Sequence, residues 1–172
     1  MLDAAASALR ALPMREPVIV DLGTGTGALA ARCVSVRSDA KLVAIDADAA
    51  ILDMARQRFA RDGVVASFLQ SSFLDASLPP CHAIVASLAL HHVRTPERKQ
   101  QLYRDCRSVL ARDGLLISAV CFVSVDSGLA ELELRCLVPR RGIGDVVGVG
   151  RHEHPFRPQR QALFAQLARH RP

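Results

Sequence analysis

The chain has 172 residues, half of them hydrophobic and 23% charged, which is typical of one globular domain and excludes a largely disordered protein. The longest nearly apolar stretch, residues 115–125, is too short to cross a bilayer as a helix. The five cysteines are scattered and never form a CxxC pair, so we expect neither a disulfide framework nor a metal site. The N-terminus has no basic segment ahead of an apolar one, and we therefore expect no secretion signal and a cytoplasmic location.

The net charge of +5 comes from the C-terminal part of the chain. Residues 1–138 hold 15 basic and 15 acidic side chains, whereas residues 139–172 hold seven arginines against Asp145 and Glu153. These arginines are neither clustered nor interleaved with aromatic residues, a distribution typical of a solvated surface. We therefore expect neither a nucleic acid nor a membrane as a partner.

Patterns typical of strands and helices alternate through the first two thirds of the chain. Short apolar runs predict strands at residues 17–22, 41–46, 64–70, 82–87 and 115–121. Apolar residues at helical spacing predict helices around them, at residues 2–12, 28–36, 47–60 and 95–111. Asp48 and Thr95 stand where the third and fourth helices begin and are candidate N-caps. The alternation indicates an α/β fold, in which helices cover both faces of a parallel sheet.

The pattern weakens after residue 121. A helical pattern, a connection rich in glycine and arginine, and a short closing helix are expected at residues 127–138, 139–158 and 159–170. Valines within the connection allow a short strand at most, because glycines separate them. We therefore expect a single domain over residues 1–172, with an α/β core at 1–121 and a helical, basic segment at 122–172.

The first predicted strand runs into three alternating glycines, in the sequence VIVDLGTGTGALA at residues 18–30. Glycines there let the backbone turn sharply and approach a ligand without β-carbons in the way, and the next helix would offer free N–H groups. Read as GxGxxA, with Gly23, Gly25 and Ala28, the loop fits a dinucleotide fingerprint in which Asp46 would hold a ribose. The same spacing also suits a sulfonium nucleoside, so two classes of ligand stay open.

Asp21 distinguishes these two ligands. It lies two residues before the first glycine, where a carboxylate would repel a pyrophosphate but would attract an ammonium group. The residues therefore favour a nucleoside that carries a positively charged methionyl end.

Four segments in order resemble the class I S-adenosylmethionine-dependent methyltransferases of the small-molecule type. DLGTGTG is similar to that family's first motif, VAID to its second, FLQSSFLDASLPPCHAIVASLALHHV to its third and fourth strands, and YRDCRSVLARDGLLISAV to its next helix, turn and fifth strand. The resemblance implies S-adenosylmethionine as cofactor and a Rossmann-like, doubly wound parallel sheet of order 3-2-1-4-5. Family members usually add a sixth strand and an antiparallel seventh, and these we expect to be missing or incomplete here.

The resemblance implies a cofactor site at the carboxyl ends of the strands, formed by Asp21, Gly23, Thr24, Gly25, Gly27, Asp46, Ala47, Ser72, Phe73 and Ser87. The glycines would pass under the methionine and ribose, and Asp21 would receive the methionine ammonium. Asp46 would accept hydrogen bonds from both ribose hydroxyls, and Ala47 would flank the adenine. Ser72 and Phe73 stand where the family often has an acid beside a small residue. The serine would therefore accept a bond from the adenine amino group, and the phenyl ring would pack on the base.

His91 and His92 follow the fourth predicted strand, in the sequence ASLALHHV, and would lie at the mouth of the site. Methyl transfer from a sulfonium mainly needs alignment and exclusion of water, because the donor is already activated. An unperturbed histidine titrates near neutral pH, so either residue is a candidate general base for an acceptor that must lose a proton. Alternatively, both histidines pack beside the cofactor or orient the loop.

We therefore expect an enzyme that transfers a methyl group from S-adenosylmethionine to a small molecule whose identity the sequence does not reveal. Two alternatives stay open. One is a non-catalytic or truncated methyltransferase-like module that acts through a partner, with an uncovered edge of the fifth strand available for a homodimer. The other is an NAD(P)-dependent oxidoreductase, for which the sequence offers no obvious Tyr/Lys or Cys/His catalytic pair.

Overall fold

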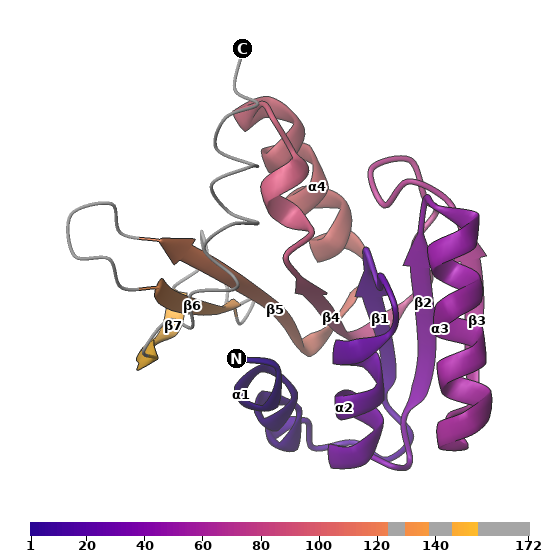
Figure 1. The fold of residues 1–172 in the computed structure, drawn as a ribbon. Helices are drawn as coiled ribbons and strands as arrows, with labels where there is room; N and C mark the ends of the chain where they lie inside the picture. The colour runs from indigo at the N-terminus through magenta and orange to yellow at the C-terminus, as the bar shows by residue number, and fades with distance from the viewer. Residues whose placement is uncertain (124–129, 138–145, 155–172) are drawn as a thin grey trace.

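The strands form one sheet of order β3-β2-β1-β4-β5-β6-β7 in the computed structural model, which describes residues 1–123, 130–137 and 146–154 (Figure 1). The first five strands are Val18–Leu22 (β1), Lys41–Asp46 (β2), Ala66–Gln70 (β3), Cys81–Ser87 (β4) and Leu110–Val123 (β5). All four pairings among them are parallel. The predicted doubly wound order 3-2-1-4-5 is confirmed.

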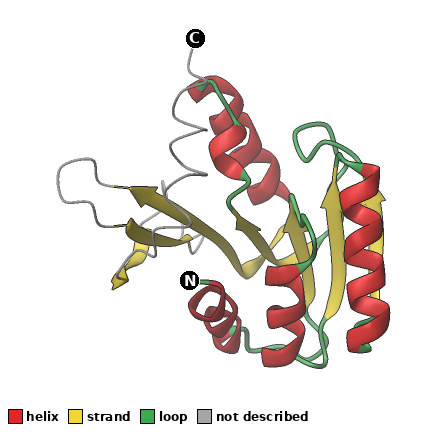
Figure 2. Ribbon diagram, viewed as in Figure 1, coloured by secondary structure: helices red, strands yellow, loops and turns green. Residues whose placement is uncertain are grey.

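Helices alternate with these strands, as the sequence pattern predicts (Figure 2). They are Leu2–Ser7 (α1), Ala28–Val36 (α2), Ala49–Asp62 (α3) and Pro96–Val109 (α4), with 3₁₀ turns at Ala8–Ala11 (η1) and Leu90–His92 (η2). Both predicted N-caps are confirmed: Asp48 Oδ1 accepts a bond from Ala50 N–H at 2.9 Å, and Thr95 Oγ1 accepts one from Arg98 N–H at 3.3 Å. Within the described residues, no helix is long and apolar enough to cross a membrane.

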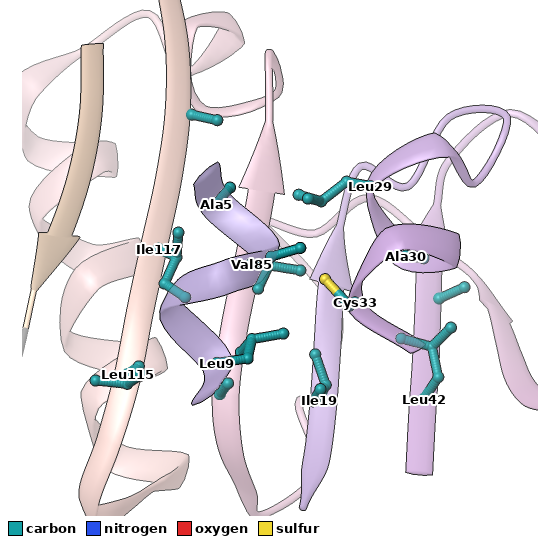
Figure 3. Packing of buried hydrophobic residues seen from close by; sticks show 14 of the residues in the cluster. Ala5, Leu9, Ile19, Leu29, Ala30, Cys33, Leu42, Val85, Leu115 and Ile117 are labelled. Carbon is teal, nitrogen blue, oxygen red and sulfur yellow. The ribbon is translucent and has the colours of Figure 1, made fainter. Parts of the chain in front are cut away.

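Two apolar clusters, one on each face of the sheet, hold the helices in place. Ile19 of β1 packs in the cluster that includes Leu9 and the buried side of α2 (Figure 3). The next residue, Val20, packs in the other cluster, which includes Leu102 of α4. Successive side chains of a strand point to opposite faces, so β1 is buried on both sides. This explains why its sequence is a continuous apolar run up to Asp21.

The segment after β5 differs from the prediction. Ala130–Leu137 forms a strand (β6) instead of a helix, antiparallel to β5, and Val146–His154 forms β7, antiparallel to β6. The sequence AELELRCL alternates apolar and charged residues with a period of two, and the edge of β5 supplies backbone partners, so strand pairing outweighs the helix propensity of alanine, glutamate and leucine. The expected closing helix lies outside the described residues.

These two strands form an antiparallel meander in place of the sixth and seventh strands that the family usually has. Because β6 pairs with residues 116–123, the predicted open edge of β5 is wrong. A homodimer through that edge therefore has no basis in this fold.

Gly27 lets α2 lie close to α3. Its backbone is left-handed, with φ of 77°, and a β-carbon there would stand 2.8 Å from Cζ of Phe59 and closer still to Cε1. Phe59 is buried in α3, so its ring has little room to move away. The third glycine of the motif is therefore required by packing between helices as well as by the turn.

We expect Gly27→Ala to destabilise the fold more than Gly63→Ala. Gly63 ends α3 with φ of 67°, and nothing in the described chain lies within 4 Å of the position that a β-carbon would take, so alanine there adds only left-handed strain of about 1–2 kcal/mol. Gly27→Ala adds the overlap with Phe59, about 1–3 kcal/mol more. Urea unfolding followed by circular dichroism measures both changes, and equal losses would contradict the packing role.

Candidate functional site

The predicted site residues meet at the carboxyl ends of β1 to β4. β1 lies between β2 and β4 in the sheet, which is the point where the strand order reverses, and ligands of open α/β sheets bind outside such a point. Thr24 N–H donates to the carbonyl of Ile45 at 2.9 Å, which anchors the glycine loop to the end of β2. The loop between β1 and α2 is thus fixed across the centre of this edge.

Asp21 is the most unusual group at this edge. Its carboxylate is 1% exposed, and Thr24 Oγ1 donates to its Oδ2 at 2.7 Å. Its other oxygen, Oδ1, is buried and has no hydrogen-bond partner among the described residues. Buried polar atoms without a partner are rare and destabilising, so Oδ1 needs a donor that the described part of the chain does not supply.

Burial raises the pKa of Asp21 to about 7, the Thr24 hydrogen bond and the backbone N–H of Ala30 oppose this shift, and the negative charge of Asp46 adds to it. The carboxyl group therefore changes its charge near neutral pH. A cation placed beside Oδ1 would favour the ionised form.

Asp46 ends β2 and holds the glycine loop. Its Oδ2 accepts a bond from Gly25 N–H at 2.8 Å, and its Oδ1 accepts one from Asp48 N–H at 3.0 Å. The carboxylate is half-buried, and each oxygen keeps a second acceptor position for a ligand. Ala47, the next residue, is exposed beside it.

The three glycines have different neighbours, although all three have positive φ. A β-carbon at Gly23 would lie 2.6 Å from Cβ of Ala89, and one at Gly27 would overlap Phe59, so the protein itself fills the space at both positions. At Gly25 nothing in the described chain lies within 4 Å of that position. Gly25 is therefore the glycine whose bare face is available to a ligand.

Ser72 and Phe73 lie in the loop after β3. Ser72 Oγ accepts a bond from Leu74 N–H at 3.2 Å, so the hydroxyl already supports the local turn while its own O–H remains a donor. Phe73 is half-buried, and its Cε1 would lie 3.7 Å from a β-carbon at Gly23. The phenyl ring thus borders the start of the glycine loop.

The chain after β4 brings further predicted residues to the same edge. Ser87 is the last residue of β4 and is half-buried. His91 and His92 lie in η2 with exposed side chains, and their ring centroids are 4.0 Å apart. Burial of part of the ring, followed by the charges of His92 and Lys99, lowers the pKa of His91. The imidazole of His91 is therefore neutral, and able to accept a proton, at neutral pH.

Sequence reasoning missed two residues at this edge. Ala89 packs against Gly23, and Leu88 has a left-handed backbone with φ of 54° and is 43% exposed. Neither alanine nor leucine carries a sequence signal for such a position, because leucine rarely adopts a left-handed conformation. Only the approach of the chain after β4 to the glycine loop reveals them.

Comparisons with known proteins agree with this geometry. A family model described as a methyltransferase domain matches residues 19–114. A carboxy-S-adenosyl-L-methionine synthase from Nautilia profundicola is 25% identical over 114 residues, which cover 66% of this chain and 48% of that protein. An uncharacterized methyltransferase from Mycobacterium bovis is 32% identical over 109 residues, which cover 62% and 48%. The chain thus spans about half the length of the curated relatives it matches.

Solved structures show the same fold. The YcgJ protein of Bacillus subtilis superposes with a TM-score of 0.56 at 22% identity, covering 72% of this chain and 53% of that one. An S-adenosylmethionine-dependent methyltransferase from Clostridium acetobutylicum superposes with a TM-score of 0.61 at 11% identity, covering 96% and 77%. Because the family model spans more than half of the 172 residues and the sheet has the order 3-2-1-4-5, the chain belongs to the class I S-adenosylmethionine-dependent methyltransferase family.

Proposed function

We propose that this chain binds S-adenosylmethionine beyond the carboxyl ends of β1, β2 and β4 and transfers its methyl group to a small-molecule acceptor. The observation that carries the proposal is the buried Oδ1 of Asp21, which lacks a partner within the described part of the chain. The ammonium group of a methionyl ligand would donate to this oxygen and stabilise its charge. A pyrophosphate would add negative charge beside Asp21 and Asp46, which disfavours the oxidoreductase alternative.

The other predicted residues have a place around such a ligand. The open face of Gly25 would let the ribose approach, and the spare acceptor positions of Asp46 would receive its hydroxyls. Ala47, Ser72 and Phe73 would border the adenine. Thr24 and Ser87 would line the methionyl end, where Thr24 also orients Asp21.

When bound, S-adenosylmethionine would supply an activated methyl group on its sulfonium. The electron pair of the carbon–sulfur bond would remain on sulfur, and a lone pair of the acceptor would form the new bond to the methyl carbon. The chain would align the acceptor and exclude water. His91 is neutral at neutral pH and would accept the proton of an acceptor that must lose one. The ring of His92, with its centroid 4.0 Å away, would pack against the ring of His91.

The alternative of a non-catalytic module has lost its structural support, because β6 covers the edge of β5. The family and the relatives described as methyltransferases support the catalytic proposal instead. The M. bovis and N. profundicola proteins share only about half of their length with this chain, so the acceptor stays open.

Calorimetric titration of the full chain with S-adenosylmethionine, S-adenosylhomocysteine and NADH tests the proposal. We expect the first two to bind in the micromolar range and NADH not to bind. A folded protein that binds neither nucleoside would overturn the cofactor assignment, and tight NADH binding would restore the oxidoreductase alternative.

We expect Asp46→Asn to remove the preference for a ribose hydroxyl. Wild type should bind S-adenosylhomocysteine about tenfold more tightly than its 2′-deoxy analogue, since a hydrogen bond to a charged group contributes about 1.5 kcal/mol. In Asp46→Asn the two ligands should bind within about twofold of each other, because the charged acceptor is gone.

The ratio of the two affinities separates recognition from loop support, because Asp46 also holds Gly25. A variant that binds both ligands more weakly but keeps the tenfold ratio would show that Asp46 acts only by holding the loop. Asp48→Asn, which changes a neighbouring helix cap, is the matched control and should keep the ratio.

We expect Asp21 to make the fold less stable as pH rises from about 4 to about 7. The pKa of its carboxyl group is about 7 in the folded chain and 3.8 as the reference value, so the folded state holds the proton more tightly in this window. The contribution of Asp21 to the free energy of unfolding therefore falls across this window and is constant above it. Asp21→Asn keeps an acceptor for Thr24 and should lack this decline.

Urea unfolding of wild type and Asp21→Asn at several pH values measures the effect, since other titrating groups cancel in the difference. The free energy of unfolding of Asp21→Asn should rise relative to that of wild type as pH rises. The variant should also bind S-adenosylhomocysteine more weakly than wild type at pH 7.5. A difference in stability that does not change with pH would contradict the assignment of this pKa to Asp21.

A further inference from the structure

We propose that the methyl acceptor is an organic anion with an apolar body, held by the post-β4 segment (residues 88–99). The inference rests on the proposed function, because it assigns the acceptor to the same edge of the sheet. Two independent features of this segment carry it: an exposed, strained leucine and an excess of cations over acids.

Leu88 is held in a conformation that leucine avoids. Its φ of 54° is left-handed, a conformation that costs a residue with a β-carbon about 1–2 kcal/mol. Its N–H donates to the carbonyl of Ala119 at 3.0 Å, which fixes the backbone, and its side chain stays 43% exposed. An exposed apolar side chain on strained backbone brings no stability to the fold, and such strain gathers at functional sites.

The neighbour of Leu88 places it beside the cofactor loop. Ala89 is buried and so close to Gly23 that a β-carbon on the glycine would lie 2.6 Å from its Cβ. Leu88 therefore stands next to the glycine loop, at the end of β4. With the cofactor bound as proposed, an acceptor would have to approach this edge to meet the methyl group.

Cations follow Leu88 without a matching set of acids. Residues 91–99 contain three permanent cations, Arg94, Arg98 and Lys99, but only one acid, Glu97. Where the structure describes the chain, the charged groups of Arg94 and Lys99 form no ion pair, whereas Lys41 and Arg56 each pair with an acid within 3.0 Å. Lys99 is close enough to His91 to affect its titration, so these charges share one surface.

The edge is therefore divided by charge. Asp21 and Asp46 lie at the ends of β1 and β2, where a cationic cofactor would bind, and the cations lie beyond β4. An anionic acceptor would be repelled from the first region and attracted to the second. The apolar body of the acceptor would cover Leu88, and its anionic group would reach Lys99 and Arg94.

Benzoate and its neutral isostere benzamide are suitable probes, because they share an apolar ring and differ in charge. The full chain is titrated with each, with and without saturating S-adenosylhomocysteine, while the histidine Cε1–H resonances are followed by NMR. We expect benzoate to bind and to raise the pKa of His91, because an anion offsets the charges of Lys99 and His92. Benzamide should bind at least about fivefold more weakly and leave that pKa unchanged.

Two variants test the two features separately. Lys99→Gln should weaken benzoate binding about three- to fivefold, whereas Arg107→Gln, the same charge change on an exposed residue in the last turn of α4, should not. Leu88→Asn keeps the size of the side chain and tolerates the left-handed backbone, so thermal stability should be unchanged or higher. This variant should weaken the binding of benzoate and of benzamide by the same factor, about fivefold, because it removes apolar contact and leaves the charged residues in place.

The inference is overturned if benzoate and benzamide bind equally, or if Lys99→Gln and Arg107→Gln weaken benzoate to the same extent, since general attraction to a basic protein would then suffice. Binding of benzoate without binding of S-adenosylhomocysteine would reject the proposed function, and with it the acceptor role, but would leave the anion-binding surface standing. Binding of S-adenosylhomocysteine without binding of benzoate would reject this inference alone.

Discussion

The loop between β1 and α2 is confined by three neighbours. The arrangement of residues at the carboxyl ends of β1 to β4 depends on this confinement. Ala89 packs closely against the loop at Gly23, and Phe59 does so at Gly27. Between them, Asp46 accepts a hydrogen bond from the backbone N–H of Gly25. Each contact ties the loop to a different part of the chain. The loop therefore sets how α3, the end of β2 and the segment after β4 meet around one small region.

Within this region the chain gives up stability in two places. Asp21 is a buried carboxylate with one oxygen that no described group satisfies, and Leu88 is an apolar residue on left-handed backbone. That both stand at the same edge of the sheet is the physical reason for placing the ligands there.

The meander of β6 and β7 changes how the sheet ends. An uncovered β5 would expose a row of backbone donors and acceptors along a long strand, and pairing with β6 satisfies them within the chain. Residues 116–119 of β5 therefore lie between β4 and β6, with a backbone partner on each side. The methyltransferase core and its extension thus form one continuous sheet, although the chain matches only about half of its curated relatives.

The sequence by itself determined the five parallel strands, the helices around them and the helix caps at Asp48 and Thr95, because periodicity and capping are local properties. It also indicated Asp21 as a ligand-binding residue, since a carboxylate beside the glycine turn would attract an ammonium group and repel a pyrophosphate. Only the tertiary structure decided that residues 130–137 form a strand, because the edge of β5 overrides local helix propensity. It alone separated the roles of the glycines and revealed Leu88, because these depend on which distant side chains fill the space beside each backbone position.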